Sequence, residues 1–322
     1  MTLHTDSILR ERYKITNIVG QGGMGSVYRA EDLRLPGRLC AIKVVVPDPS
    51  LTVEQQNQAQ NQFLQEASIL AQLDHPNLPK VSDFFSEEGQ DFLVMDFVPG
   101  DDLKGILNEN QAPLAEDQVI SWATQIVDGL SHLHKQKPPV LHRDIKPANI
   151  KLTPDGRIKL VDFGLVKLMA PDDSRTITVV QGRGTALYTP LEQYGGDGGH
   201  TDARTDIYAL GGTLYHLLTN TRPADAKARF LNPRILKPPH TLNPNVSQIV
   251  SAAVMWALEM HPDDRPDTVQ QFYQVLTGEK PMPGTRTAVS PGKLFVDALK
   301  ANWVPILLAV GLFFVAIILT IL

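Results

Sequence analysis

The sequence lacks most of the features that mark secreted, zinc-binding or nucleic-acid-binding proteins. Its single cysteine, Cys40, cannot form an internal disulfide, which fits a reducing compartment. The nine histidines contain no HExxH spacing and no Cys/His pairing, so a zinc site is not expected. The net charge of -5 provides no basic field for phosphate backbones, and nucleic acid is therefore not expected as a partner.

The N-terminus also lacks the apolar core of a signal peptide, so residues 1–12 are interpreted as a short polar leader. The long apolar run lies at the opposite end, at 303–322, where only Thr320 is appreciably polar. A helix rises about 1.5 Å per residue, so a run of this length reaches roughly 30 Å, the thickness of a hydrocarbon core. The run predicts one transmembrane helix, and Lys293 and Lys300 before it favour a cytoplasmic N-terminal side.

Between these ends, residues 13–277 read as one globular unit, and 278–302 as a linker rich in proline and glycine. The unit begins with strand patterns and a glycine-rich turn, followed by a strand at 40–46. A helix is expected at about 54–73, and apolar residues at helical spacing predict another at 116–135. A small strand-rich part followed by a larger helical part indicates an α+β architecture.

A glycine-rich stretch, with glycines at 20, 22, 23 and 25, precedes Ser26 and Val27. Dinucleotide-binding and kinase loops both use the GxGxxG spacing, so the spacing alone is weak evidence. Here the residues after Gly25 read as a strand and not as the start of a helix. A hairpin that covers phosphates with backbone N–H groups is the better interpretation, because side chains would block that approach.

Lys43 follows Gly25 by eighteen residues, and strand alternation puts it on the same face as Ala41. Ala41 is therefore expected to pack on a nucleotide base while Lys43 reaches its phosphates. A lysine that faces a cleft needs a partner, and Glu66 on the following helix is the expected one. Alone, Glu66 would more readily be read as a solvated helix carboxylate.

The strongest pattern is His142-Arg-Asp144-Ile-Lys146-Pro-Ala-Asn149. Phosphoryl transfer to a hydroxyl needs a carboxylate to orient the hydroxyl, a cation near the γ-phosphate and oxygen ligands for magnesium. Asp144, Lys146 and Asn149 supply these groups in that order. Asp162, in an Asp-Phe-Gly triplet eighteen residues past Asp144, is expected to be the main metal ligand.

With these motifs in this order, residues 13 to about 277 resemble a Hanks-type, eukaryotic-like serine/threonine protein kinase of the bacterial kind. The resemblance implies a bilobal fold with an N-lobe at 13–95, a hinge at 96–98 and a helical C-lobe at 99–277. It implies that Lys43 pairs with Glu66 and that Asp144 is the catalytic base. It also implies that Asn149 and Asp162 hold Mg²⁺, for which Mn²⁺ would substitute.

The resemblance further implies an ATP site in which the glycine-rich loop covers the nucleotide and Met95 precedes the hinge as the gatekeeper. Asp206 matches the aspartate that braces the catalytic loop in the family. The implied ATP-contacting residues are Val19, Gly20, Gln21, Gly22, Gly23, Gly25, Val27, Ala41, Lys43, Met95, Asp96, Val98 and Asp162.

The expected substrates are serine and threonine hydroxyls of proteins, because Lys146 and Thr185 resemble the pair found in serine/threonine kinases. The activation segment departs from the family pattern: it ends Pro190-Leu191-Glu192 instead of Ala-Pro-Glu. Glu192 is nevertheless expected to pair with Arg265. Another departure is Lys151, where the family usually places an apolar adenine floor; its aliphatic stem is expected to serve instead.

Regulation is expected through the hydroxyls of the activation segment. Arg143 precedes the catalytic aspartate, and autophosphorylation at Thr176 or Thr178, in a transient homodimer, would give it a phosphate to bind. The alternative to this regulation is that the segment is an exposed polar loop whose hydroxyls have no regulatory role.

The sequence thus predicts a single-pass protein of the cell membrane with a cytoplasmic kinase domain that takes ATP and protein substrates. The alternative function is a catalytically weak pseudokinase scaffold at the membrane. Loss of the lysine, the base or the metal aspartate would mark such a scaffold, but Lys43, Asp144 and Asp162 are all present.

Overall fold

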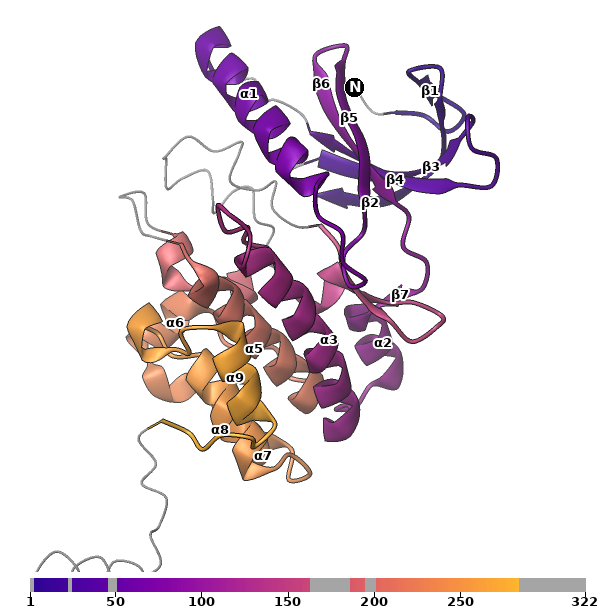
Figure 1. Ribbon diagram of the computed structural model, residues 1–322. Coiled ribbons are helices and arrows are strands. Elements are labelled where there is room, and N and C mark those ends of the chain that lie inside the picture. The colour runs from indigo at the N-terminus through magenta and orange to yellow at the C-terminus, as the bar shows by residue number, and fades with distance from the viewer. Residues whose placement is uncertain (1–2, 23–24, 46–50, 163–185, 195–200, 284–322) are drawn as a thin grey trace, which may run out of the picture. The chain divides into compact units, whose positions relative to one another are not determined.

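The computed structural model describes residues 3–22, 25–45, 51–162, 186–194 and 201–283. Strands β1–β6 and helix α1 lie together in one lobe, and helices α2, α3 and α5–α9 lie in the other (Figure 1). One compact unit extends as far as Lys280. The expected bilobal α+β fold, with a β-rich N-lobe and a helical C-lobe, is confirmed.

The N-lobe is built on one antiparallel sheet with strand order β1-β2-β3-β4-β6-β5. Its strands are β1 (Ile8–Leu9), β2 (Tyr13–Gly22), β3 (Gly25–Asp32), β4 (Leu39–Val45), β5 (Val81–Glu87) and β6 (Gln90–Asp96). The segment interpreted as a leader thus contributes the edge strand β1.

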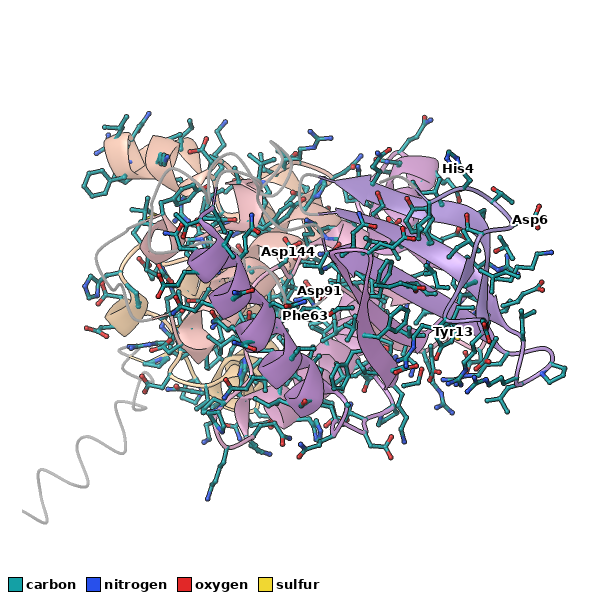
Figure 2. The ribbon with its side chains drawn as sticks, turned by 90° about the horizontal axis from the view of Figure 1, so that it is seen from above. His4, Asp6, Tyr13, Phe63, Asp91 and Asp144 are labelled. Carbon is teal, nitrogen blue, oxygen red and sulfur yellow. The ribbon has the colours of Figure 1, made fainter. Side chains whose placement is uncertain are left out.

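Alternating apolar residues of these strands form the core of the N-lobe. Tyr13, Phe85 and Phe92 stack in series, with ring centroids 6.1 Å and 5.0 Å apart. Cys40 is fully buried in the same cluster, as expected for a small apolar side chain in a sheet core. Figure 2 labels Tyr13 in the sheet and Phe63, which is buried on α1.

Helix α1 (Val53–Leu70) begins at a capping box, because the Thr52 side chain accepts from the Gln55 backbone and the Gln55 side chain accepts from the Thr52 backbone. Its buried residues, Phe63, Ala67 and Leu70, follow the apolar stripe expected from the sequence. The helix ends before the predicted boundary at residue 73, since the next residues bond three positions back, as in Leu73 N–H to Leu70 C=O.

The C-lobe surrounds α5, whose residues are almost all buried. Its helices are α2 (Leu103–Asn110), α3 (Glu116–His134), α5 (Ala203–Thr219), α6 (Ala226–Leu231), α7 (Pro239–Leu242), α8 (Gln248–Ala257) and α9 (Val269–Leu276). A small antiparallel sheet, ordered β7-β8-β9, borders α2 and α3; its strands are β7 (Asp101–Asp102), β8 (Ile150–Leu152) and β9 (Ile158–Leu160).

Within the ranges given above, no helix is both long and apolar enough to cross a membrane. The predicted transmembrane helix at 303–322 lies outside the described residues, as does most of the linker.

Candidate active site

The loop that carries Asp144 is bound through its backbone by a buried aspartate of α5. Asp206 is fully buried, and its carboxylate accepts hydrogen bonds from the backbone N–H groups of His142 and Arg143 at 2.9 Å and 2.7 Å. His134, at the end of α3, brings Nε2 to 2.8 Å from the same carboxylate. Three residues therefore converge on Asp206, which braces the start of the loop as the resemblance implied.

The charge of Asp206 is maintained by these partners. Burial alone would raise the pKa of Asp206, but the hydrogen bond from His134 and the surrounding donors lower it below its usual range. Asp206 therefore remains an ionised acceptor at neutral pH. The contact with His134 had no signal in the sequence, because no motif connects the end of α3 with α5.

Asp144 directly follows the two residues that Asp206 binds, and two side chains donate hydrogen bonds to one of its carboxylate oxygens (Figure 2 labels Asp144). Lys146 Nζ and Asn149 Nδ2 each lie 2.8 Å from Asp144 Oδ2, and Asn149 also donates to the Asp144 backbone oxygen at 2.9 Å. The other oxygen, Oδ1, is buried and has no hydrogen-bond partner among the described residues. It is an acceptor available to a hydroxyl group.

Lys43 and Asp162 meet where β4 approaches the segment after β9. Lys43 Nζ lies 2.7 Å from Asp162 Oδ1, and the lysine is buried. Burial alone would raise the pKa of Asp162, but the Lys43 ammonium holds it below its usual range. An ionised carboxylate and an ammonium group therefore face the same position, as a nucleotide–metal complex requires.

The structure does not bring Lys43 and Glu66 into an ion pair. Among the described residues, the ammonium of Lys43 has Asp162 as its ion-pair partner. Burial raises the pKa of Glu66 to about 7, and the positive charge of Arg143 only partly offsets this effect. Glu66 is thus a half-buried carboxyl whose pKa lies near neutral pH. The order of the motifs did not indicate this property.

The sheet register gathers the expected nucleotide-contacting residues on one face. Val27 lies directly opposite Lys43, and Met95 directly opposite Ala41, in the antiparallel ladder. Directly paired residues share a face, and Ala41 and Lys43 share one because they are two apart on the same strand. The base-contacting and phosphate-contacting positions expected from the sequence therefore point to the same side.

The glycine-rich loop is the hairpin between β2 and β3, in which Gly22 pairs with Gly25. Gly25 has φ of +134°, and a Cβ there would collide with the backbone oxygen of Val44. Only glycine fits this position without displacing the backbone. Val19 is exposed on β2, and Gly20 on the same strand has open space beside it. Gly23 lies outside the described residues.

The hinge is tied to β4 by contacts that the sequence did not suggest. The Phe97 backbone N–H donates to the Leu39 oxygen at 3.2 Å, and Arg38 Nη2 lies 3.0 Å from Asp96 Oδ1. Arg38 also approaches the fully buried Asp32 carboxylate, at 3.5 Å. No motif joins these positions, so only the spatial structure reveals them.

Arg12, which lies between β1 and β2, completes this network. Its guanidinium donates to both oxygens of Asp32, at 2.9 Å and 2.7 Å, in a bidentate arrangement. The N-terminal segment is therefore bonded to the same carboxylate that Arg38 approaches.

The donor set fits a hard divalent cation. Among the described residues, no group of three or more His, Cys, Asp or Glu side chains could hold a metal ion. The carboxylate of Asp162 and the amide oxygen of Asn149 are hard ligands that suit Mg²⁺, whose remaining ligands are commonly phosphate oxygens and water. These two residues would hold the ion together with a bound nucleotide.

Several predicted residues of the activation segment lie outside the described residues, among them Thr176, Thr178 and Thr185. The end of the segment is described, and there Glu192 receives two hydrogen bonds from Arg265. The expected pair is therefore confirmed despite the displaced proline.

This geometry agrees with the comparison to known families, in which residues 13–276 match the protein kinase domain. The chain belongs to the protein kinase family. The chain is 34% identical over 267 residues to the serine/threonine-protein kinase PrkC of Bacillus subtilis. The chain is 31% identical over 294 residues to the serine/threonine-protein kinase PknB of Mycobacterium tuberculosis.

These alignments cover 81% and 86% of this chain but only 39% and 45% of the two relatives. The chain therefore spans less than half the length of these curated relatives. Among solved structures, the kinase domain of Mycobacterium tuberculosis PknI is similar, with a TM-score of 0.65 and 26% identity. That match covers 87% of this chain and 100% of the solved one.

Proposed function

We propose that the protein is a serine/threonine protein kinase, which transfers the γ-phosphate of ATP to serine or threonine hydroxyls of proteins. The observation that carries the proposal is Asp144, with one oxygen bound by Lys146 and Asn149 and the other buried without a partner among the described residues. The names of PrkC and PknB as serine/threonine-protein kinases support the same activity.

In this reaction the substrate hydroxyl donates a hydrogen bond to Asp144 Oδ1. The hydroxyl oxygen forms a bond to the γ-phosphorus, and the bond from that phosphorus to the bridging oxygen breaks. The electron pair of the broken bond leaves with ADP, and the hydroxyl proton goes to Asp144. Lys146, 2.8 Å from the Asp144 carboxylate, is positioned to stabilise negative charge on the transferred group.

Lys43, on the face shared with Ala41 and Met95, orients the nucleotide by contacting its phosphates. Mg²⁺, or Mn²⁺ as a substitute, held by Asn149 and Asp162, would neutralise charge on the phosphate oxygens when bound. Asp162 is suited to this role because the pKa of its carboxyl lies below its usual range.

Phosphate transfer from radiolabelled ATP to a mixed serine, threonine and tyrosine peptide library tests the proposal. Wild type should label serine and threonine, and Asp144→Asn should lose nearly all transfer. Asp74→Asn, at an exposed aspartate of the N-lobe, serves as the matched control and should retain it. No transfer by wild type would indicate a scaffold instead, and equal transfer by wild type and Asp144→Asn would show that Asp144 is not the catalytic base.

Activation by phosphorylation of Thr176 or Thr178, in trans within a transient homodimer, is part of the proposal. Its support is Arg143, whose buried Nε has no hydrogen-bond partner among the described residues and so remains available for a phosphate. Thr176→Ala/Thr178→Ala should lower activity several-fold, and phosphate incorporation should depend on the square of protein concentration. Full activity of this variant without segment phosphate would refute the mechanism.

Membrane anchoring through residues 303–322, with the kinase domain in the cytoplasm at the cell membrane, is also proposed. It rests on the apolar run itself, which matches a hydrocarbon core in length. The full chain should sediment with membranes through a carbonate wash, and a chain ending at residue 302 should not. Added protease should reach the kinase domain only after the cells are opened.

A further inference from the structure

A buried tyrosine–histidine pair lies beside the end of the activation segment. Tyr188, in the short 3₁₀ turn η2 (Ala186–Tyr188), has its hydroxyl 2.7 Å from His216 Nδ1 on α5. Both residues are buried. The turn η2 follows Thr185 directly, so the pair lies next to the part of the segment that resembles the serine/threonine-selecting site.

This pair carries no charge at neutral pH. Burial, together with the positive charges of Arg222 and Lys104, lowers the pKa of His216 to about 4. Burial raises the pKa of Tyr188 to about 12, with Arg222 opposing the shift. The charged groups that influence the pair are therefore cations, one from the loop after α5 and one from α2.

The packing around Gly212 explains the position of Arg222. A Cβ on Gly212 would lie 3.3 Å from Tyr188 and 3.7 Å from Pro223. The chain that leaves α5 therefore returns beside Tyr188, and Arg222, immediately before Pro223, is exposed there.

Two further exposed cations lie on α6 and α2. Lys227, on α6, has its ammonium 4.4 Å from the ring centre of Tyr194, whose hydroxyl donates to the Ala186 oxygen of η2 at 3.3 Å. Lys104 is in the first turn of α2, which packs against the turn of the catalytic loop that ends at Asn149. Lys104, Arg222 and Lys227 thus come from three elements and form what we call the cationic surface.

The carboxylates nearest to these cations in the sequence are turned toward backbone groups. Asp102 caps α2 by accepting from the Gly105 N–H at 2.9 Å, and Asp225 caps α6 by accepting from the Ala228 N–H at 2.9 Å. Among the described residues, Lys104 and Arg222 have no ion pair. Both cations are therefore exposed to solvent without a carboxylate partner among these residues, and Lys104 lies on the helix that packs against the turn of the catalytic loop.

Resting on the proposed kinase activity, we propose that the cationic surface binds aspartate and glutamate side chains that flank the phosphoacceptor, so that acidic peptides are the preferred substrates. Charge complementarity carries the assignment: the surface presents three exposed cations from three elements, and the buried Tyr188–His216 pair, on which Arg222 and Lys104 act, supplies no negative charge. A basic peptide would meet like charges there.

The test compares serine peptides that differ only at flanking positions, with glutamate, glutamine or lysine in turn. Wild type should give a kcat/KM for the best glutamate peptide on the order of tenfold above that for its lysine counterpart, as two or three exposed charge contacts provide. The ratio should shrink as salt is raised, because exposed charges are screened. The glutamine peptides report transfer without a flanking charge.

Lys104→Glu/Arg222→Glu should reverse the ratio in favour of lysine peptides. Lys135→Glu/Lys237→Glu makes the same charge change at exposed lysines with no ion pair among the described residues, and it should keep the wild-type ratio. Circular dichroism and transfer to the glutamine peptide show whether each variant is folded.

An unchanged ratio in Lys104→Glu/Arg222→Glu, or a wild-type ratio near one at low salt, would overturn the proposal and leave the kinase activity standing. The absence of Asp144-dependent transfer to every peptide would instead refute the proposed function. Because the wild-type ratio and its salt dependence need no variant, misfolding of the double mutant would not remove the test.

Discussion

Arg265 binds Glu192 through two hydrogen bonds, at 2.6 Å from Nη1 and 3.1 Å from Nη2. The arginine side chain is fully buried and the glutamate 11% exposed. Arg265 also donates to the backbone oxygens of Glu259 and Met260. This one side chain therefore ties the end of the activation segment to the loop between α8 and α9. The displacement of Pro190 from the usual family position does not prevent this contact.

Arg265→Ala should destabilise the protein strongly, because it leaves the Glu192 carboxylate buried without its counter-charge. Removing one partner of a buried ion pair typically costs about 3–5 kcal/mol. Urea denaturation followed by circular dichroism should show this loss.

Arg157→Ala is the matched control, since the Arg157–Asp155 pair is exposed on both sides, at 61% and 63%. An exposed pair is worth at most about 1 kcal/mol. A similar loss in both variants would contradict the structural role of the buried pair.

The second prediction concerns Lys43 and Asp162. In Lys43→Met the burial of Asp162 is no longer offset by the ammonium, so the pKa of that carboxyl should rise. Binding of ATP with Mg²⁺, measured by calorimetry, should then weaken as pH falls from about 8 to about 6 more than it does in wild type. Phosphate transfer should drop by about 10²–10³-fold.

Lys14→Met, at a partly exposed lysine paired with Asp6, is the control and should keep the wild-type dependence on pH. Parallel binding curves for Lys43→Met and wild type would exclude Lys43 as the group that keeps Asp162 ionised.

A third prediction follows from the contact of Arg38 with the hinge. Arg38→Ala should raise the KM for ATP while kcat stays near the wild-type value, because the hinge loses a contact that orients it for adenine. The side chains of Arg38 and Asp96 are partly exposed, at 27% and 50%, so the effect should be no more than about fivefold.

Arg38→Lys should restore part of the affinity, and Arg34→Ala, at a neighbouring exposed arginine of the same loop, should have no effect. A fall in kcat with an unchanged KM would show that Arg38 does not act through the hinge.

The order of motifs in the sequence was sufficient to predict the two lobes and the grouping of Val27, Ala41, Lys43 and Met95. This succeeded because strand alternation and ladder pairing fix faces without knowledge of distant contacts. The Glu192–Arg265 pair was likewise predictable, since the resemblance names both residues.

Contacts that depend on how separate elements pack could not be predicted in this way. Whether Lys43 meets Glu66 or Asp162 depends on how closely α1 approaches β4, and periodicity within either element says nothing about that distance. The contacts of Arg12 and Arg38 with Asp32 join residues that no motif connects. Charge pairs across elements are properties of tertiary packing.

The last prediction uses the pKa of Glu66, which burial raises from its ordinary 4.5 to about 7 in the folded protein. Between pH 4.5 and about pH 7, Glu66 in the folded protein holds a proton that Glu66 in the unfolded chain has released. The free energy of unfolding contributed by this group therefore falls as pH rises through that window, and stays low above it. Replacing the carboxyl by an amide removes the cost of burying the charge, so nucleotide-free Glu66→Gln should be more stable than wild type.

This advantage of Glu66→Gln should be larger at about pH 8.5 than at about pH 5.5, by about 1 kcal/mol once solvent screening of a partly exposed group is allowed for. Urea midpoints of both proteins at the two pH values measure it. Glu54→Gln, at an exposed position in the first turn of α1, should show no difference between the two pH values. An equal advantage of Glu66→Gln at both pH values would mean that Glu66 is already ionised at the lower one, and hence that a cation pairs with it in solution.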